Sequence, residues 1–200
     1  MIGTSSEFFK KNTKKGYLIL YIYAKSMKIL LVQLEGAFPN VKSLSSKLSE
    51  LFGMETAIYF GIIKIPSSFF NLKKRKWDAE KIISMLREHF SKTREGNFLV
   101  LGLCHEDIFA DSLNFVYGLG EKNGNFGVIS SFRLNPTFYN ESMNAKLFEE
   151  RALKEATHEI GHMLNLDHCK NKRCVMSFSP NIIFVDRKEP EFCEKCKFLL

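Results

Sequence analysis

Three histidines and one glutamate are grouped between residues 157 and 176, where the sequence reads THEIGHMLNLDHCKNKRCVM. His158 and His162 are four positions apart, so on an α-helix their imidazoles project from one face toward a common point. Glu159 follows His158 directly, and its carboxylate would lie at the edge of that face. Two such histidines and a glutamate form the H-E-x-x-H arrangement, in which the imidazoles bind zinc and the carboxylate acts as a general base.

A third ligand is expected from His168, six positions after His162. A continued helix would carry His168 away from the metal-binding face, so the helix must end and the chain must turn back. Asn165 stands where this turn is needed, and asparagine adopts left-handed backbone angles more readily than most residues. Three histidines would then bind one ion and leave a fourth position open, as a catalytic zinc site requires. The alternative interpretation is that unrelated core and surface histidines have this spacing by coincidence.

Four of the five cysteines follow in two short groups, C-x4-C and C-x2-C, and they are Cys169, Cys174, Cys193 and Cys196. Pairs with such spacings are typical of a closed tetrahedral zinc site, so we expect a second, structural Zn²⁺ that ties the C-terminus to the catalytic segment. The alternatives are two disulfides or a redox-active Cys-x-x-Cys pair. They are less favoured because the chain has no clear secretory signal and no thioredoxin-like strand precedes Cys193.

These motifs together resemble the archaemetzincins, which are metzincin-type zinc peptidases with a second zinc held by four cysteines. Softer similarities extend over most of the chain from Met27, in the segments MKILLVQLEG, NFVYGLGE and VISSFRL. The resemblance implies that Met176 lies beneath the metal site as the residue of the Met-turn. Asn165 departs from the glycine common at that position, and the 16 residues between Met176 and Cys193 are one fewer than the family spacing.

The resemblance implies a zinc metallopeptidase that cleaves short peptides or acts like an aminopeptidase, with two Zn²⁺ per chain. Glu159 would take a proton from the attacking water and pass it to the leaving amine. No additional oxyanion donor is evident, because Phe178 stands where a tyrosine would have helped. Two alternatives remain open: a zinc-binding protein with a vestigial or non-proteolytic hydrolase site, and a zinc-stabilised module that binds nucleic acid or protein.

The net charge of +7 over 200 residues is concentrated at the N-terminus, where residues 1–26 carry five lysines and one glutamate. The remaining 174 residues carry only +3, so a nucleic-acid partner is not expected. The basic run at residues 73–76 is interpreted as a solvated loop. The apolar run at residues 16–24 is too short to span a bilayer. We expect a cytoplasmic monomer without nucleic-acid or membrane partners.

Residues 1–26 are predicted to be a disordered extension, and residues 27–200 a single α/β domain that becomes α+β toward its C-terminus. The first half alternates strands and helices, which predicts a largely parallel βαβαβ core. The expected strands are residues 29–34, 56–65 and 98–104, and the expected helices are residues 41–52, with Asn40 as N-cap and Gly53 as stop, and 77–90.

The second half is expected to complete a compact metzincin-like domain with a mixed sheet, a long active-site helix and a C-terminal Cys₄ zinc knot. Shorter strands are predicted at residues 114–120 and 127–134, and the resemblance makes Val128–Phe132 the antiparallel edge strand. The long helix spans residues 141–164, with Asn140 or Ser142 as its cap and an apolar face from Ala145 to Met163. Residues 177–192 would form a wall of the cleft, and residues 104–107 are a less favoured metal cluster.

Overall fold

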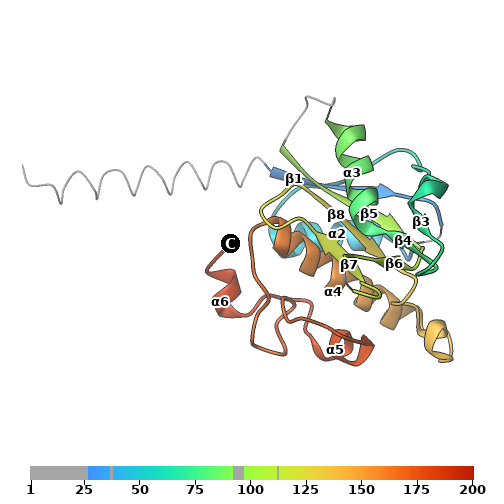
Figure 1. Ribbon diagram of the computed structural model, residues 1–200. Coiled ribbons are helices and arrows are strands. Elements are labelled where there is room, and N and C mark those ends of the chain that lie inside the picture. Colours follow the sequence, from blue (N-terminus) through green and yellow to red (C-terminus); the bar gives the residue numbers. More distant parts are fainter. Residues whose placement is uncertain (1–26, 37, 92–96, 112) are drawn as a thin grey trace, which may run out of the picture.

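The computed structural model describes residues 27–36, 38–91, 97–111 and 113–200. The predicted extension at residues 1–26 lies outside the described residues and stays a prediction. A five-stranded sheet, ordered β2-β1-β5-β8-β7, forms the centre of the molecule (Figure 1). Its strands are β1 (Met27–Gln33), β2 (Thr56–Ile58), β5 (Asn97–Cys104), β7 (Gly118–Gly120) and β8 (Phe126–Ser130).

The parallel βαβαβ core is confirmed. β1 pairs in parallel with both β2 and β5, and β5 pairs in parallel with β8. Helix α2 (Val41–Phe52) packs with α4 (Ala145–Met163) in the cluster on one face of the sheet, whereas α3 (Ala79–Phe90) packs in the cluster on the other face. Both faces are therefore covered, which explains why β5 is an almost uninterrupted apolar run.

The boundaries of α2 agree with the sequence. The side chain of Asn40 accepts a hydrogen bond of 3.2 Å from the backbone N–H of Ser43, and Gly53 ends the helix with a φ of 61°. Helix α3 begins later than predicted, because residues 76–78 form a strand and Asp78 is the N-cap. A second small sheet of β3 (Phe70–Asn71), β4 (Lys76–Asp78) and β6 (Ile108–Phe109) was not expected, and the basic run at residues 73–76 forms its turn and enters β4.

The second predicted strand, residues 56–65, is wrong beyond Ile58. The chain leaves the sheet at Phe60, whose side chain is fully exposed, and at Gly61, whose φ of 147° is not an extended-strand value. It returns only for an isolated parallel bridge between Ile63 and Leu34. A continuous apolar pattern therefore concealed a turn that only a glycine adopts without strain.

The edge of the sheet is also corrected. Val128–Phe132 is not the antiparallel edge, because β8 lies between β5 and β7 and its residues Val128 and Ile129 are fully buried. The edge strand is β7, which runs antiparallel to β8. A Cβ added to Gly120 would lie 2.4 Å from the backbone oxygen of Glu159, so only glycine lets this strand approach α4 so closely.

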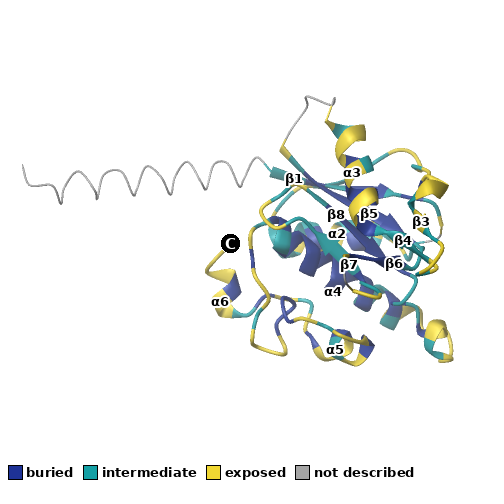
Figure 2. Ribbon diagram, in the orientation of Figure 1, coloured by how far each residue is buried: buried dark blue, intermediate teal, exposed yellow. Residues whose placement is uncertain are grey.

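Helix α4 spans Ala145–Met163 rather than residues 141–164, and its N-cap is Asn144, not Asn140 or Ser142. The side chain of Asn144 accepts a hydrogen bond of 3.0 Å from the backbone of Leu147. Ala145 is exposed, contrary to its predicted place on the apolar face, but every residue from 151 to 161 is buried (Figure 2). The helix thus runs through the interior and holds whatever it carries rigidly.

Two short helices, α5 (Ile182–Arg187) and α6 (Glu194–Lys197), complete the C-terminal segment, which packs beside α4 (Figure 1). The arrangement confirms the α/β class with an α+β C-terminal part. Among the described residues, no helix is long and apolar enough to cross a membrane.

Candidate metal centres

The three histidines of the motif converge as predicted. The Nε2 atoms of His158 and His162 are 3.1 Å apart, and one ring nitrogen from each of the three, including His168, lies within 4.8 Å of the others. With Zn–N bonds of about 2.0–2.1 Å, tetrahedral zinc ligands are separated by about 3.3 Å. The donor set and its spacing therefore fit zinc. No other group of three or more potential ligands is found in the described residues except the four cysteines.

The turn that brings His168 back is formed by Asn165, whose φ is 72°. Its backbone N–H donates to the carbonyl of His162 at 2.8 Å, and the N–H of Leu166 donates to that of Gly161 at 2.9 Å. These two bonds close the helix end, and the carbonyl of His162 also accepts from the backbone N–H of Asn123 at 3.0 Å. The predicted role of Asn165 as the turning residue is confirmed.

Backbone carbonyl groups fix the ring orientation of two of the histidines. Nδ1 of His158 is 2.8 Å from the carbonyl oxygen of Val175, and Nδ1 of His162 is 2.8 Å from that of Leu166. Each Nδ1–H donates to its carbonyl, which leaves Nε2 as the lone-pair nitrogen facing the cluster. Burial, followed by the positive charge of Lys188, keeps the pKa of His158 well below its ordinary value. The imidazole is thus neutral, which is the form that binds a metal.

Glu159 lies between the histidines and the edge strand. A Cβ added to Gly118 would lie 2.7 Å from its Cγ and 2.8 Å from its Oε1, so β7 presses directly on this carboxylate. Burial and then the carboxylate of Glu155 raise the pKa of Glu159 to about 8, against the opposing effects of Lys188 and the N–H of Gly120. Such a group can both accept and return a proton near neutral pH.

Met176 is fully buried beneath the helix segment that carries the histidines. A Cβ on Gly161 would lie 2.4 Å from its sulfur, so the thioether packs against the helix backbone between Glu159 and His162. This is the position that the resemblance implies for Met176. The ring of the neighbouring Phe178 meets the ring of His168 edge-on, with centroids 5.2 Å apart and an interplanar angle of 60°.

A cavity of about 510 Å³ opens beside the histidines. Its walls come from β7 and the segment before it, from α4, and from the chain after Met176. Phe178, Ser179 and Lys188 are among the lining residues, so the predicted contribution of residues 177–192 to the cleft is confirmed. At the rim, Lys122 and Asp167 form an ion pair of 2.5 Å.

The second centre lies directly after the first in sequence. The sulfur atoms of Cys169, Cys174, Cys193 and Cys196 all lie within 4.8 Å of one another. Cys169 and Cys193 are separated by 3.7 Å between sulfurs, much longer than a disulfide bond and close to the roughly 3.8 Å between thiolates on a tetrahedral zinc. All five cysteines are free. Neither predicted alternative, disulfides or a redox pair, matches this four-sulfur cluster.

The less favoured metal cluster at residues 104–107 does not assemble. Nδ1 of His105 is 2.8 Å from the hydroxyl of Ser131, and Asp107 makes two hydrogen bonds with Arg133. Cys104 is buried at the end of β5, and burial raises the pKa of its thiol to about 12. His105 and Asp107 thus bond to residues outside the group, and residues 104–107 form no ligand set.

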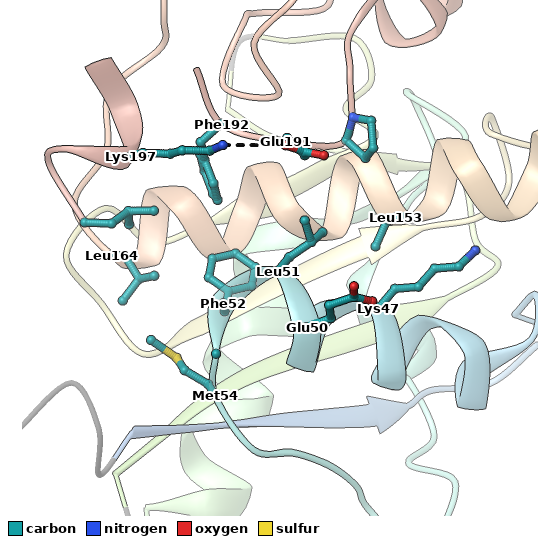
Figure 3. Close-up of a pocket in the computed structure, with 13 residues that line it drawn as sticks. Lys47, Glu50, Leu51, Phe52, Met54, Leu153, Leu164, Glu191, Phe192 and Lys197 are labelled. Carbon is teal, nitrogen blue, oxygen red and sulfur yellow. Dashed lines mark ion pairs between the residues drawn. The ribbon is translucent and has the colours of Figure 1, made fainter. Parts of the chain in front are cut away.

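A larger cavity, of about 800 Å³, lies away from the histidines, between the end of α2, α4 and the C-terminal segment (Figure 3). Leu51, Phe52 and Leu164 line its interior. Charged side chains stand around them, and one pair of these, Glu191 and Lys197, forms an ion pair of 3.6 Å. None of the metal-binding candidates lines this space, so we assign the chemistry to the smaller cavity.

Residues 15–200 match the model of Peptidase family M54. The chain belongs to this family. It is 44% identical over 156 residues to an archaemetzincin of Methanocaldococcus jannaschii, covering 78% of this chain and 82% of that protein. As a member of M54 it is a zinc metallopeptidase, a hydrolase that acts on peptide substrates.

Solved structures agree with this M54 assignment. The archaemetzincin of Archaeoglobus fulgidus, crystallised with malonate, superposes with a TM-score of 0.72 at 31% identity and covers 86% of this chain and 99% of its own. A zinc-dependent peptidase of Methanocorpusculum labreanum superposes with a TM-score of 0.76 at 25% identity. The superposition covers 86% of this chain and 98% of that protein. The metzincin-like fold expected from the sequence is thereby confirmed.

Several residues of the peptidase cleft were not identified from the sequence. The sequence does offer one indication for Glu155: it precedes Glu159 by one helical turn, so both side chains must lie on the same face of the helix. The sequence offers no such indication for Lys188 and Ser179, because they reach the cleft from a segment whose path depends on the tertiary fold. The sequence indicates Gly118 only as part of the predicted strand at residues 114–120, although its missing side chain makes room for Glu159.

Proposed function

We propose that His158, His162 and His168 hold the catalytic zinc of this peptidase and that Glu159 is its general base. The observation that carries the proposal is the convergence of three imidazole nitrogens within 4.8 Å beside a buried carboxylate. Zinc, when bound, supplies Lewis-acid chemistry that activates water and polarises a peptide carbonyl. Three protein ligands leave a coordination position for that purpose.

The side chains of the cleft divide the remaining work. Glu159 takes the proton of the attacking water and passes it to the nitrogen of the leaving amine. Gly118 and Gly120 hold the glutamate from the side of β7, and the carbonyls of Val175 and Leu166 orient His158 and His162. The rigid helix α4 keeps base and ligands in register.

We also propose a second, structural zinc held by Cys169, Cys174, Cys193 and Cys196, so that each chain binds two Zn²⁺. Four thiolates would complete a tetrahedral shell and leave no place for a substrate. The sulfurs lie in a packed cluster with Leu166, Val175, Met176 and Phe192, which supports a role in holding the C-terminal segment against the catalytic centre.

The proposed substrates are short peptides, cleaved in an aminopeptidase-like manner. A cavity of about 510 Å³ suits a few residues rather than a folded chain. The outer edge of β7 has no neighbouring strand within the described residues, and an extended peptide would pair with it by strand addition. The short length of β7, three residues, limits the peptide segment held in this way.

A peptide-library digest with the zinc-loaded protein beside Glu159→Ala tests the proposal. We expect the parent to release fragments and the variant to retain its zinc while losing at least about a hundredfold in rate. Cleavage by Glu159→Ala at the parental rate would show that another group is the base. Zinc content measured on the same samples separates loss of the base from loss of the metal.

A further inference from the structure

An ion pair is buried at one end of the cleft. Nζ of Lys188 lies 3.0 Å from Oε1 of Glu155, and their side chains are only 1% and 4% exposed. Both residues line the same cavity as His158 and Glu159. Lys188 follows α5 and Glu155 belongs to α4, so two separate segments bring opposite charges to one point of the cleft.

Lys188 has fewer hydrogen-bond partners than the two buried cationic side chains of α4. Arg151 makes two hydrogen bonds to Asp186 and one to the carbonyl of Leu134, and Lys154 bonds both Glu150 and the backbone of Asp186. Within the part of the chain that the structure describes, the ammonium of Lys188 has only Glu155 as a hydrogen-bond partner. An ammonium carries three donors, so two of them remain for a ligand.

A third polar group without a partner lines the same cavity. The hydroxyl oxygen of Ser179 is buried and has no hydrogen-bond partner, and Ser179 also lines this space. Buried polar groups are normally paired, and leaving them unpaired is costly. Spare donors on Lys188, a second carboxylate oxygen on Glu155 and an unpaired hydroxyl together describe a polar pocket that a ligand completes.

The position of the pocket relative to the scissile bond follows from Glu159. Because this residue returns the proton to the leaving nitrogen in the proposed function, the amine side of the substrate lies beside it. Glu155 is one helical turn before Glu159 on the same face of α4. The side chain of the first residue on the amine side therefore extends toward Glu155 and Lys188.

The charges of the pocket restrict what binds there. A carboxylate would be attracted by Lys188 but repelled by Glu155, and an ammonium would meet the reverse. An apolar side chain would leave both charges without added partners. A carboxamide matches the pair, because its oxygen accepts from the ammonium and its NH₂ donates to the carboxylate.

We propose that Glu155 and Lys188, with Ser179, form a specificity pocket that selects glutamine or asparagine as the first residue on the amine side of the cleaved bond. The inference rests on the proposed function of the histidine centre. A site built to hydrogen-bond a polar substrate group discriminates strongly against analogues that lack it, so a preference of at least about tenfold over leucine is expected.

The test compares kcat/KM of the zinc-loaded full chain on peptides that differ only at that residue: Gln, Asn, Glu, Lys and Leu. The parent should prefer Gln and Asn. Glu155→Gln removes the repulsion of carboxylates and should shift the preference to Glu. Lys188→Met leaves a lone carboxylate and should shift it to Lys. These opposite shifts would not arise from a structural role alone.

Two further variants control for effects on folding and for the general effect of removing a buried lysine. The double variant Glu155→Gln/Lys188→Met leaves neither charge of the pair unpaired, and it should cleave the Leu peptide as readily as the others. Lys154→Met removes a buried lysine that is not among the lining residues of the cleft and should keep the parental order of substrates. Cleavage of all five peptides at similar rates by the parent, or an order unchanged in all three pocket variants, overturns the specificity pocket alone. Failure of the parent to cleave any peptide overturns the proposed function and this inference with it.

Discussion

The two candidate metal centres are adjacent in sequence, yet they are built in opposite ways. His168 ends one and Cys169 begins the other. The histidine centre has three ligands, one of them exposed, and opens into the cavity beside β7. The cysteine centre has four ligands, two of them buried, packed among apolar side chains. In the proposed function, ligand number and burial would divide the tasks: the histidine centre would keep a coordination position for the substrate, and the cysteine centre would fix the chain that shapes the cleft.

Removing one proposed ligand from each centre should have the largest and most different effects. Cys174→Ser should abolish the structural zinc and lower the free energy of unfolding by roughly 3 kcal/mol or more, with loss of activity as a consequence. His168→Ala should lose the catalytic zinc and activity but keep the fold. Calorimetry and zinc analysis of both variants measure the difference. A His168→Ala protein that melts as early as Cys174→Ser would make the two centres equally structural.

Chelation separates the centres without mutation. We expect a chelator to remove one zinc first, together with peptidase activity, while circular dichroism stays native. The second zinc should leave only with unfolding, because its four ligands belong to a closed and packed shell. Counting the reactive thiols follows both steps, because the four clustered cysteines should become reactive only when the second zinc is released. Loss of both ions in a single step that leaves the fold intact would contradict the division of tasks.

Cys104 provides an internal reference for that count. Burial raises the pKa of its thiol to about 12, so the reactive thiolate is almost absent at neutral pH in the folded chain. Cys104 should react only after denaturant exposes it. Modification of Cys104 in the native protein, detected by mass spectrometry, would show that the sheet opens more readily than its burial indicates.

Gly118→Ala tests how closely the histidine centre depends on the edge strand. The added Cβ would lie 2.7 Å from Cγ of Glu159 and 2.8 Å from Ile129, so the carboxylate must shift. A loss of about tenfold in kcat with unchanged zinc content is expected, since a small displacement of a catalytic group costs rate. Gly124→Ala, whose Cβ would meet only Glu121 of its own turn, is the matched control and should retain the parental rate.

The smallest effect is expected at Asn165, which links the helix to both centres. Its φ of 72° costs a residue with an ordinary Cβ roughly 1–2 kcal/mol, whereas glycine adopts it freely. Asn165→Ala should therefore lower the unfolding free energy by about 1 kcal/mol, and Asn165→Gly should not lower it. Equal stability of the two variants in a denaturant titration would show that the left-handed backbone at Asn165 does not affect stability.

The sequence was most informative where local rules decide the structure. The four-residue spacing of His158 and His162, the turn at Asn165 and the caps of α2 follow from helix geometry and backbone preference. The edge strand was misplaced because only the resemblance assigned it to Val128–Phe132, and an apolar pattern such as that around Val128 indicates burial but not which strands are neighbours. Glu155 and Lys188 were missed because their pairing depends on the path of residues 177–192, which no local rule fixes.

The most direct test of the two-centre account is anomalous X-ray scattering at the zinc absorption edge from crystals of the purified protein. We expect two peaks per chain, one among His158, His162 and His168 and one among the four cysteine sulfurs. A single peak at the cysteines, with the three imidazoles turned away from one another, would contradict it.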